Sequence, residues 1–219
     1  MPNKYQIAIL GGGPGGYVAA IRAAQLGFKT VVIDKDNLGG ICLNWGCIPT
    51  KSLLKNAEIY DNVKNHGKDF GIYTKDLSFK FDEIIKRSRD ISDKITKNVE
   101  MLIKKNKVDR IRGFGKLISQ NEIEIFDKDG KKIETISADN IIIATGARPK
   151  VFPNIPVDRK NIITSTEAMS LSEQPKELVI IGAGAIGIEF AYFDSVLGTK
   201  VTVIEMMDHI LPVEDAEVS

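Results

Sequence analysis

The sequence has few cysteines and no long apolar run, and both shortages narrow what the chain can be. Only two of its 219 residues are cysteine, too few for the disulfide framework of a small secreted protein or for a four-cysteine zinc site. No apolar stretch approaches the roughly 20 residues that a membrane-spanning helix needs. Met1–Gln6 lead straight into the apolar run Ile7–Leu10, which is too short for a signal-peptide core. The sequence therefore predicts a soluble, cytoplasmic protein.

An excess of charge of either sign is also missing. Thirty basic residues against 29 acidic ones leave a net charge of +1, so the electrostatic signature of nucleic-acid or anionic-membrane binding is absent. Residues 81–103 repeat apolar side chains at spacings of three and four, which predicts a long amphipathic helix. Basic and acidic residues alternate on it, so a solvated face is a better interpretation than a nucleic-acid surface. We expect no nucleic acid, membrane or metal among the partners.

What the chain does have is a strand, helix and strand pattern that occurs twice. Its apolar fraction of 43% is ordinary for a globular protein, and its length suits one large domain with part of another. The first copy consists of a strand at Ile7–Leu10, a helix at Tyr17–Leu26 and a strand at Lys29–Asp34. The second consists of a strand at Leu178–Ile181, a helix at Ala185–Leu197 and a strand at Lys200–Glu205. Both predict βαβ units of an α/β fold.

A glycine motif joins the first strand of the first copy to its helix. The motif has the spacing GxGxxG, with Gly11 for a tight turn, Gly13 for close approach to a pyrophosphate and Gly16 for helix-to-strand packing. Asp34 follows Gly11 by 23 residues (34 − 11), at the end of the second strand, where an acid holds a ribose hydroxyl. With this context the motif predicts a dinucleotide site.

The second copy repeats the motif as Gly182, Gly184 and Gly187, and Glu205 again follows by 23 residues (205 − 182). Two such motifs predict two different dinucleotides. An acid at the end of the second strand favours NAD over NADP, because a 2′-phosphate would meet a like charge. The alternative is a duplication in which one copy no longer binds anything.

The two cysteines, Cys42 and Cys47, lie five residues apart in a loop-like segment from Gly39 to Pro49, followed by a predicted helix at Thr50–Val63. A helix N-terminus favours the thiolate, which is the species that attacks a disulfide. We therefore interpret the two cysteines as a redox pair. The alternative interpretations are half of a metal site and two inert thiols. Lys51 lies one helical turn after Cys47 and is either a solvated charge or a partner for a nearby cofactor.

Between the two copies the sequence predicts an antiparallel meander. Its alternating segments are Arg110–Ile118, Glu122–Phe126 and Lys131–Ile136, with a turn at Asp129-Gly130. A wholly apolar strand, Asn140–Ala144, follows and ends at Thr145-Gly146. The proline-containing stretch Pro149–Pro156 predicts a crossing between domains.

With these residues in view, the chain resembles the pyridine nucleotide-disulfide oxidoreductase family, most of all its dihydrolipoamide dehydrogenase branch. The resemblance rests on the redox signature Gly39–Lys51, on Gly11–Gly16, on Ala144-Thr145-Gly146 and on Gly182–Glu189. It implies an FAD-binding domain with a meander over residues 1–148 and an incomplete NAD-binding domain over 149–219. It also implies that the central and C-terminal dimerisation domains are absent, so we expect a truncated chain.

The resemblance also assigns site residues. Cys47 would be the sulfur beside the flavin, Cys42 the interchange sulfur, and Lys51 would pair with Glu189 near the flavin ring. The FAD-binding positions would be Gly11, Gly13, Pro14, Gly15, Gly16, Asp34, Lys35, Gly40, Lys51, Gly115, Ala144, Thr145 and Gly146. The NAD-binding positions would be Gly182, Gly184, Ala185, Ile186, Gly187 and Glu205.

The reaction implied is oxidation of dihydrolipoamide by NAD+ through the Cys42–Cys47 disulfide and FAD. The partner would be the lipoyl domain of a 2-oxoacid dehydrogenase or glycine cleavage complex, and the full-length parent would be a homodimer. The family's base is a histidine supported by a glutamate; neither His66 nor His209 has that context, so we expect little turnover from this chain alone. Alternatives are a glutathione or mercuric reductase, the former disfavoured by Glu205, and a non-catalytic FAD-binding fragment.

Overall fold

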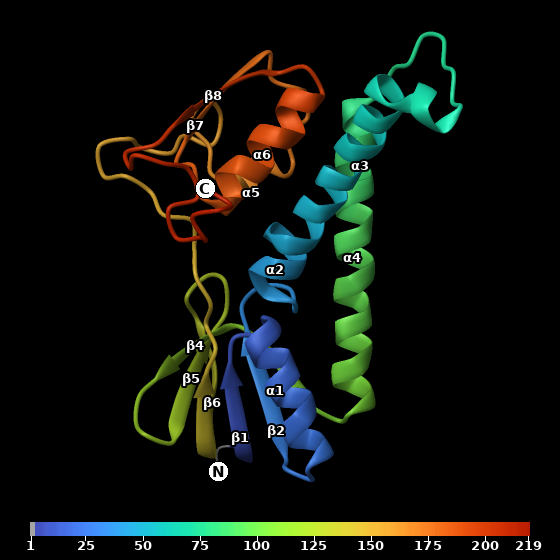
Figure 1. Cartoon of the computed structure of the whole chain (residues 1–219). Coiled ribbons are helices and arrows are strands. Elements are labelled where there is room, and N and C mark those ends of the chain that lie inside the picture. The colour runs from blue at the N-terminus through green and yellow to red at the C-terminus, as the bar shows by residue number, and fades with distance from the viewer. Residues whose placement is uncertain (1–2) are drawn as a thin grey trace. The chain divides into compact units, whose positions relative to one another are not determined.

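The computed structural model describes residues 3–219, which divide into two compact units (Figure 1). Unit 1 contains the described residues up to Cys47 together with Ser92–Lys150, and unit 2 contains Ile48–Ile91 and Val151–Ser219. The division of function between residues 1–148 and 149–219 stays a prediction.

Unit 1 contains six strands and two helices of its own. They are β1 (Asn3–Leu10), α1 (Pro14–Gln25), β2 (Thr30–Asp34), α2 (Gly40–Trp45), β3 (Asp109–Arg112), β4 (Phe114–Leu117), β5 (Glu122–Phe126) and β6 (Lys132–Ile143). Unit 2 contains the 3₁₀ turn η1 (Gly67–Phe70), α5 (Ser165–Ala168), β7 (Glu177–Ile181), α6 (Ala185–Val196) and β8 (Lys200–Ile204). Helix α3 (Cys47–Asn65) belongs to unit 2 from Ile48 onwards, and α4 (Phe81–Lys105) belongs to unit 2 up to Ile91.

The six strands of unit 1 form one mixed sheet in the order β3-β2-β1-β6-β5-β4. The four strands β3, β2, β1 and β6 run parallel to one another, whereas β5 runs antiparallel to both of its neighbours, β6 and β4. In β2, Thr30–Ile33 are all buried, as expected of a parallel strand covered on both faces. The α/β fold and the antiparallel meander predicted from the sequence are therefore confirmed.

Two predicted strand boundaries in this sheet are wrong. Arg110–Ile118 is not one segment, because the chain changes partner at the buried Gly113: β3 pairs with β2 and β4 pairs with β5. Conversely, Lys131–Ile136 and Asn140–Ala144 are not separate strands. They merge into the 12-residue strand β6, which pairs with β5 over its first half and with β1 from Ile136 onwards.

The segment Gly39–Pro49, predicted to be a loop, is mostly helical. Gly39 caps α2 with a φ of 97°, a conformation that glycine adopts without strain. Helix α3 then begins at Cys47, three residues before the predicted start at Thr50. Pro49 is tolerated because the first N–H groups of a helix have no partner within it. Tertiary contacts of α2 override the loop-forming composition of this segment.

Helix α1 packs closely on the sheet because its inner face carries only small residues. Gly16, Ala20 and Ala23 are its buried positions. A Cβ added to Gly16 would lie 1.8 Å from the carbonyl oxygen of Gly11, so only glycine permits this approach. Gly13, the N-cap, has an ordinary φ of −72°, and a Cβ there would meet nothing closer than the Gly40 Cα at 3.6 Å.

Unit 2 repeats the first βαβ unit at a constant offset of 171 residues (182 − 11). Helix α6 spans Ala185–Val196 where α1 spans Pro14–Gln25. The N–H of Gly182 donates to Ile204 O at 2.8 Å, as that of Gly11 donates to Ile33 O at 2.8 Å. Strands β7 and β8 are parallel and form a two-stranded sheet. The second predicted βαβ unit is thus confirmed.

The core of unit 2 lies where α6 meets α3 and the first part of α4. Its buried members are Leu53, Ala57, Phe81, Ile85, Met169, Phe190, Phe193 and Leu197. Asp194 lies on the same helix and is only 3% exposed. Its Oδ1 has no hydrogen-bond partner among the described residues. Burial raises the pKa of this carboxyl from 3.8 to about 7.

None of the helices within residues 3–219 combines the length and the apolar character required to span a membrane.

Gly13 and Gly16 of the first motif predict different effects of the same substitution. Gly16→Ala should lower the free energy of unfolding by about 1–3 kcal/mol or more, because its Cβ would overlap backbone atoms. Gly13→Ala should change it by less than about 1 kcal/mol, because the native φ suits alanine and the unfolded chain loses entropy, which offsets the poorer N-cap that alanine makes. Urea unfolding of both variants measures the difference; equal stabilities would contradict the loop geometry.

Asp194 predicts a pH dependence of stability. Between the unfolded pKa of 3.8 and the folded value of about 7, the folded state binds more protons, so stability should fall as the pH rises through this window. The shift corresponds to about 4 kcal/mol at most. Asp194→Asn should abolish this loss, as measured by urea unfolding at about pH 4 and about pH 8.

The control is Glu58→Gln on α3, which removes one negative charge from an exposed side chain of the same unit. Equal losses of stability in the parent chain and in Asp194→Asn across this window would show that Asp194 does not cause the loss.

Candidate functional site

The first glycine motif, Asp34 and Ala144 come together at one edge of the unit 1 sheet. The motif follows β1, Asp34 ends β2, and Ala144 follows β6. Because these strands are parallel, their carboxyl ends lie at the same edge, where open α/β sheets bind their ligands. A Cβ on Gly11 would lie 2.1 Å from Ala144 O, so the loop after β6 is packed directly against the motif.

Asp34 holds the glycine loop in place. Its Oδ2 accepts a hydrogen bond from the N–H of Gly12 at 2.5 Å, and its Oδ1 accepts one from the N–H of Asp36 at 2.8 Å. A carboxylate has about four acceptor sites, so these two bonds leave capacity for a ribose hydroxyl. The acid therefore positions the loop in addition to the ribose contact predicted from the sequence.

The loop leaves space that the protein itself does not need. A Cβ on Gly15 would meet only Ala144 Cβ, at 4.0 Å, and Gly13 is similarly open. Backbone N–H groups at the start of the 12-residue helix α1 favour an anion at this position. Glycines that internal packing does not require, at a helix N-terminus, fit the pyrophosphate of a dinucleotide.

Other predicted positions surround the same edge or lie on its surface. Gly115 lies against the ends of β1 and β2, since its Cβ would come 2.4 Å from Leu10 Cδ2 and 3.4 Å from Ile33 Cγ2. Pro14 is the first residue of α1 and is exposed. Lys35 forms an exposed ion pair with Asp36 at 3.1 Å. The exposed residues Thr145 and Gly146 follow Ala144 beyond the end of β6.

The helix that carries Cys42 begins against the glycine loop. The N–H of Gly39, its N-cap, donates to Gly12 O at 2.7 Å. A Cβ on Gly40 would lie 2.7 Å from Gly13 Cα, so the two backbones touch. The structure thus places α2 next to the loop that fits a dinucleotide.

The two cysteines lie on either side of a tight connection. Cys42 is half-buried on α2, and Cys47 is the exposed first residue of α3. Between them, a Cβ on Gly46 would lie 3.4 Å from Cys42 Cα and 3.1 Å from Ile41 O. Gly46, the residue before Cys47, therefore packs against the residue of α2 that carries the first sulfur, Cys42.

The second glycine loop repeats the arrangement in unit 2. The N–H of Ala183 donates to Glu205 Oε2 at 2.7 Å, the counterpart of the bond from Gly12 to Asp34. Hydrogen bonds from the backbone N–H groups of Met207, Ala183 and Met206 hold the pKa of Glu205 below its ordinary value. A Cβ on Gly184 would meet nothing within 4 Å. This loop also has open space at the N-terminus of a helix, where Ala185 and Ile186 are exposed.

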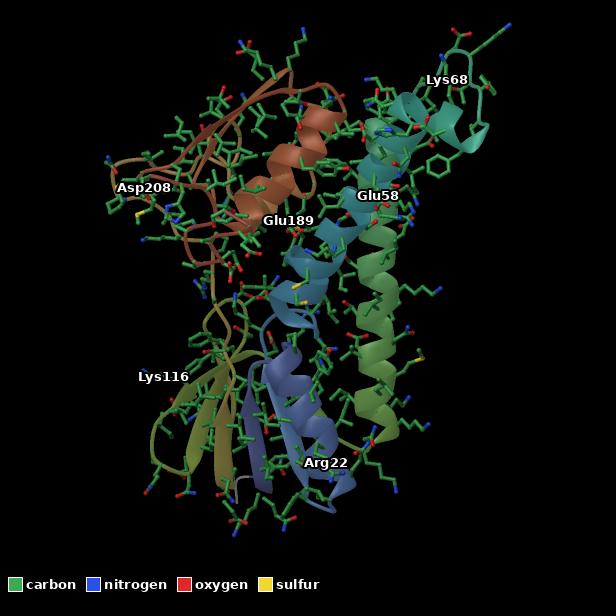
Figure 2. All side chains as sticks on the ribbon, in the orientation of Figure 1. Arg22, Glu58, Lys68, Lys116, Glu189 and Asp208 are labelled. Atoms are coloured by element: carbon green, nitrogen blue, oxygen red, sulfur yellow. The ribbon has the colours of Figure 1, made fainter. Side chains whose placement is uncertain are left out.

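Lys51 and Glu189 form an ion pair within unit 2. Lys51 lies in the second turn of α3. Glu189 lies near the start of α6 (Figure 2). Both histidines of the chain are exposed, and each lies beside an aspartate. The Nδ1 atom of His66 lies 3.7 Å from Asp69 Oδ2, and that of His209 lies 2.5 Å from Asp208 Oδ1. No group of three or more His, Cys, Asp or Glu side chains suited to a metal occurs among residues 3–219.

Sequence reasoning missed three residues that build these sites. Gly12 and Ala183 donate the N–H groups that the two acids bind, and the side chain of Asn44 bonds to the backbone around α2. The constant offset of 171 residues points to Gly12 and Ala183 as equivalent positions. Nothing in the sequence distinguishes Asn44 from a loop asparagine.

Several known proteins of one family are similar to this chain. Residues 5–219 match the pyridine nucleotide-disulphide oxidoreductase family. A dihydrolipoyl dehydrogenase of Chlorobaculum parvum is 46% identical over 99% of this chain and 46% of its own length. One of Bacillus subtilis is 43% identical over 100% of this chain and 48% of its own length.

A solved structure, the HOCl-induced flavoprotein disulfide reductase RclA of Escherichia coli, is similar with a TM-score of 0.81 and 30% identity. It was solved as a Cu(II) complex of a cysteine-to-serine mutant, and the likeness covers 98% of this chain and 45% of that one. The chain spans about half the length of these relatives. With the family match over nearly all its residues, the chain belongs to the pyridine nucleotide-disulphide oxidoreductase family.

Proposed function

We propose that this chain is the FAD-binding and redox-active part of a dihydrolipoamide dehydrogenase, together with the beginning of its NAD-binding site. One observation carries the proposal: the helix with Cys42 begins directly against a glycine loop that fits a dinucleotide pyrophosphate. The names of the relatives support the choice of dihydrolipoamide over other dithiols. We also propose the division into an FAD domain over 1–148 and an incomplete NAD domain over 149–219.

The residues that would hold FAD lie around the edge where β1, β2 and β6 end. The glycine loop would contact the pyrophosphate through its N–H groups, and Asp34 would accept a ribose hydroxyl while it fixes the loop. Around them we place Pro14, Gly15, Lys35, Gly40, Gly115, Ala144, Thr145 and Gly146. NAD would bind the equivalent loop at Gly182–Gly187 with Glu205 on its ribose. When bound, FAD supplies the chemistry that links a dithiol to NAD+, by accepting two electrons and passing them on as a hydride.

The cysteines would exchange with the substrate. A thiolate of dihydrolipoamide attacks the Cys42 sulfur of the Cys42–Cys47 disulfide and displaces Cys47 as a thiolate. The second substrate thiol then attacks the mixed disulfide, which releases the oxidised dithiolane and leaves Cys42 as a thiol. Two electrons pass from the substrate to the protein; one substrate proton ends on the Cys42 thiol, and the other goes to solvent when the attacking thiol ionises.

The remaining assignments follow from the family. We propose that Lys51 and Glu189 serve the flavin and that the partner is the lipoyl domain of a 2-oxoacid dehydrogenase or glycine cleavage complex. We propose a cytoplasmic location and, for a full-length parent, a homodimer. Neither exposed histidine has the setting of the family's base, so residues 1–219 alone should show little lipoamide turnover.

An absorbance spectrum tests the proposal. The purified chain should contain flavin, and one equivalent of dithiol should produce a new long-wavelength band, because reduction frees a Cys47 thiolate beside the cofactor. Cys47→Ser should bind flavin but show no band. Cys42→Ser, the matched control, should show the band without dithiol, because its Cys47 cannot form the disulfide.

Two results would contradict the proposal. One is a flavin spectrum that dithiol leaves unchanged in the parent chain. The other is colourless protein that takes up no added FAD.

A further inference from the structure

Asn44 is a buried amide in the middle of the redox segment. It lies on α2, two residues after Cys42 and three before Cys47. Its side chain is on the inner side of the helix, and the residue is only 8% exposed. Nothing in the proposed exchange chemistry uses it.

The side chain of Asn44 joins three parts of unit 1. Its Nδ2 donates to Leu38 O at 3.1 Å and to Gly40 O at 2.9 Å. Its Oδ1 accepts a hydrogen bond from Thr96 Oγ1, on α4, at 3.2 Å. Asn44 therefore ties α2 to the segment before it and to the long helix beside it.

Helix α2 depends on such external bonds. It has only six residues, and no side-chain hydrogen bond caps its N-terminus. An isolated helix of this length is unstable in water, because nucleation costs more than so few internal bonds return. The position of Cys42 is thus determined by what attaches α2 to its surroundings.

We propose that Asn44 is a positioning residue that holds Cys42 at the separation from Cys47 at which the disulfide closes. The inference rests on the proposed function, since it assumes that the two cysteines form a redox pair. Disulfides form only within a narrow range of Cα separation and orientation. A helix that Asn44 anchors keeps the two sulfurs at a high effective concentration, and loss of the anchor lowers that concentration.

An asparagine amide matches its surroundings better than similar side chains. It offers N–H donors to the two carbonyls and one oxygen to the Thr96 hydroxyl. An aspartate would present a charged oxygen to the Leu38 and Gly40 carbonyls, and an alanine would leave all three partners without this bond. These bonds therefore require both the donors and the acceptor of the amide, and a side chain of the same size without them could not make all three.

The test is the redox equilibrium of the cysteine pair in the full 219-residue chain. Glutathione disulfide oxidises the two thiols to one disulfide and is itself reduced to two glutathione thiols, so atoms and electrons balance. Alkylation and mass spectrometry at several ratios of the two glutathione forms give the midpoint. Asn44→Ala should need about tenfold more oxidising conditions, equivalent to about 30 mV for this two-electron couple.

A matched control separates positioning from stability. Asn121 is also in unit 1, and its Nδ2 likewise donates to two backbone carbonyls, those of Ala138 at 2.8 Å and Asp139 at 3.1 Å. Asn121→Ala should lower stability to urea and leave the redox midpoint unchanged. Thr96→Val removes only one of the bonds of Asn44, so it should shift the midpoint in the same direction as Asn44→Ala and by less.

The outcomes are distinct. If the midpoint stays unchanged in both Asn44→Ala and Thr96→Val, or shifts equally in Asn121→Ala, the positioning role is wrong. If Asn44→Ala does not fold, the Thr96→Val midpoint alone decides. If the parent forms no Cys42–Cys47 disulfide at any glutathione ratio, the proposed function fails rather than the role of Asn44.

Discussion

The structure depends on one interaction that it uses twice, a carboxylate at the end of a strand that binds a backbone N–H of the neighbouring glycine loop. Asp34 holds Gly12 in unit 1, and Glu205 holds Ala183 in unit 2. The bond fixes the loop so that the carbonyl group of its first glycine lies against the last glycine of the motif. The N-terminus of the helix stays open. The open N-terminus is what a dinucleotide phosphate requires.

In the proposed function, the redox pair is attached to the first of these loops through backbone contacts. Because the glycines at 13 and 40 touch, the helix bearing Cys42 is positioned by the same loop that fits the cofactor. Gly46, which precedes Cys47 at the start of α3, packs against Cys42. If these are the redox sulfurs and the cofactor loop that we propose, they form one local assembly, which accounts for the close spacing of their motifs in the sequence.

The loops and the acids could be predicted because their chemistry leaves few residue choices: Gly16 and Gly187 must lack side chains. The boundaries of the strands could not be predicted, because the pairing between strands determines them. Gly113 separates two strands only because β3 and β4 have different partners. The helix α2 was missed because its local composition favours a loop and the bonds that stabilise it, such as that from Thr96 to Asn44, cross 52 residues of sequence.

Calorimetric titration of FAD into the flavin-free chain tests the central claim most directly, with Gly13→Ala and Gly184→Ala as a matched pair. Both glycines have an ordinary φ, −72° and −74°, and room for a methyl group. We predict one FAD per chain, with binding at least about tenfold weaker in Gly13→Ala and unchanged in Gly184→Ala, because the pyrophosphate of FAD would lie only at the first loop. Equal FAD affinity in all three proteins, or weakening in Gly184→Ala alone, would contradict the assignment of FAD to the first loop.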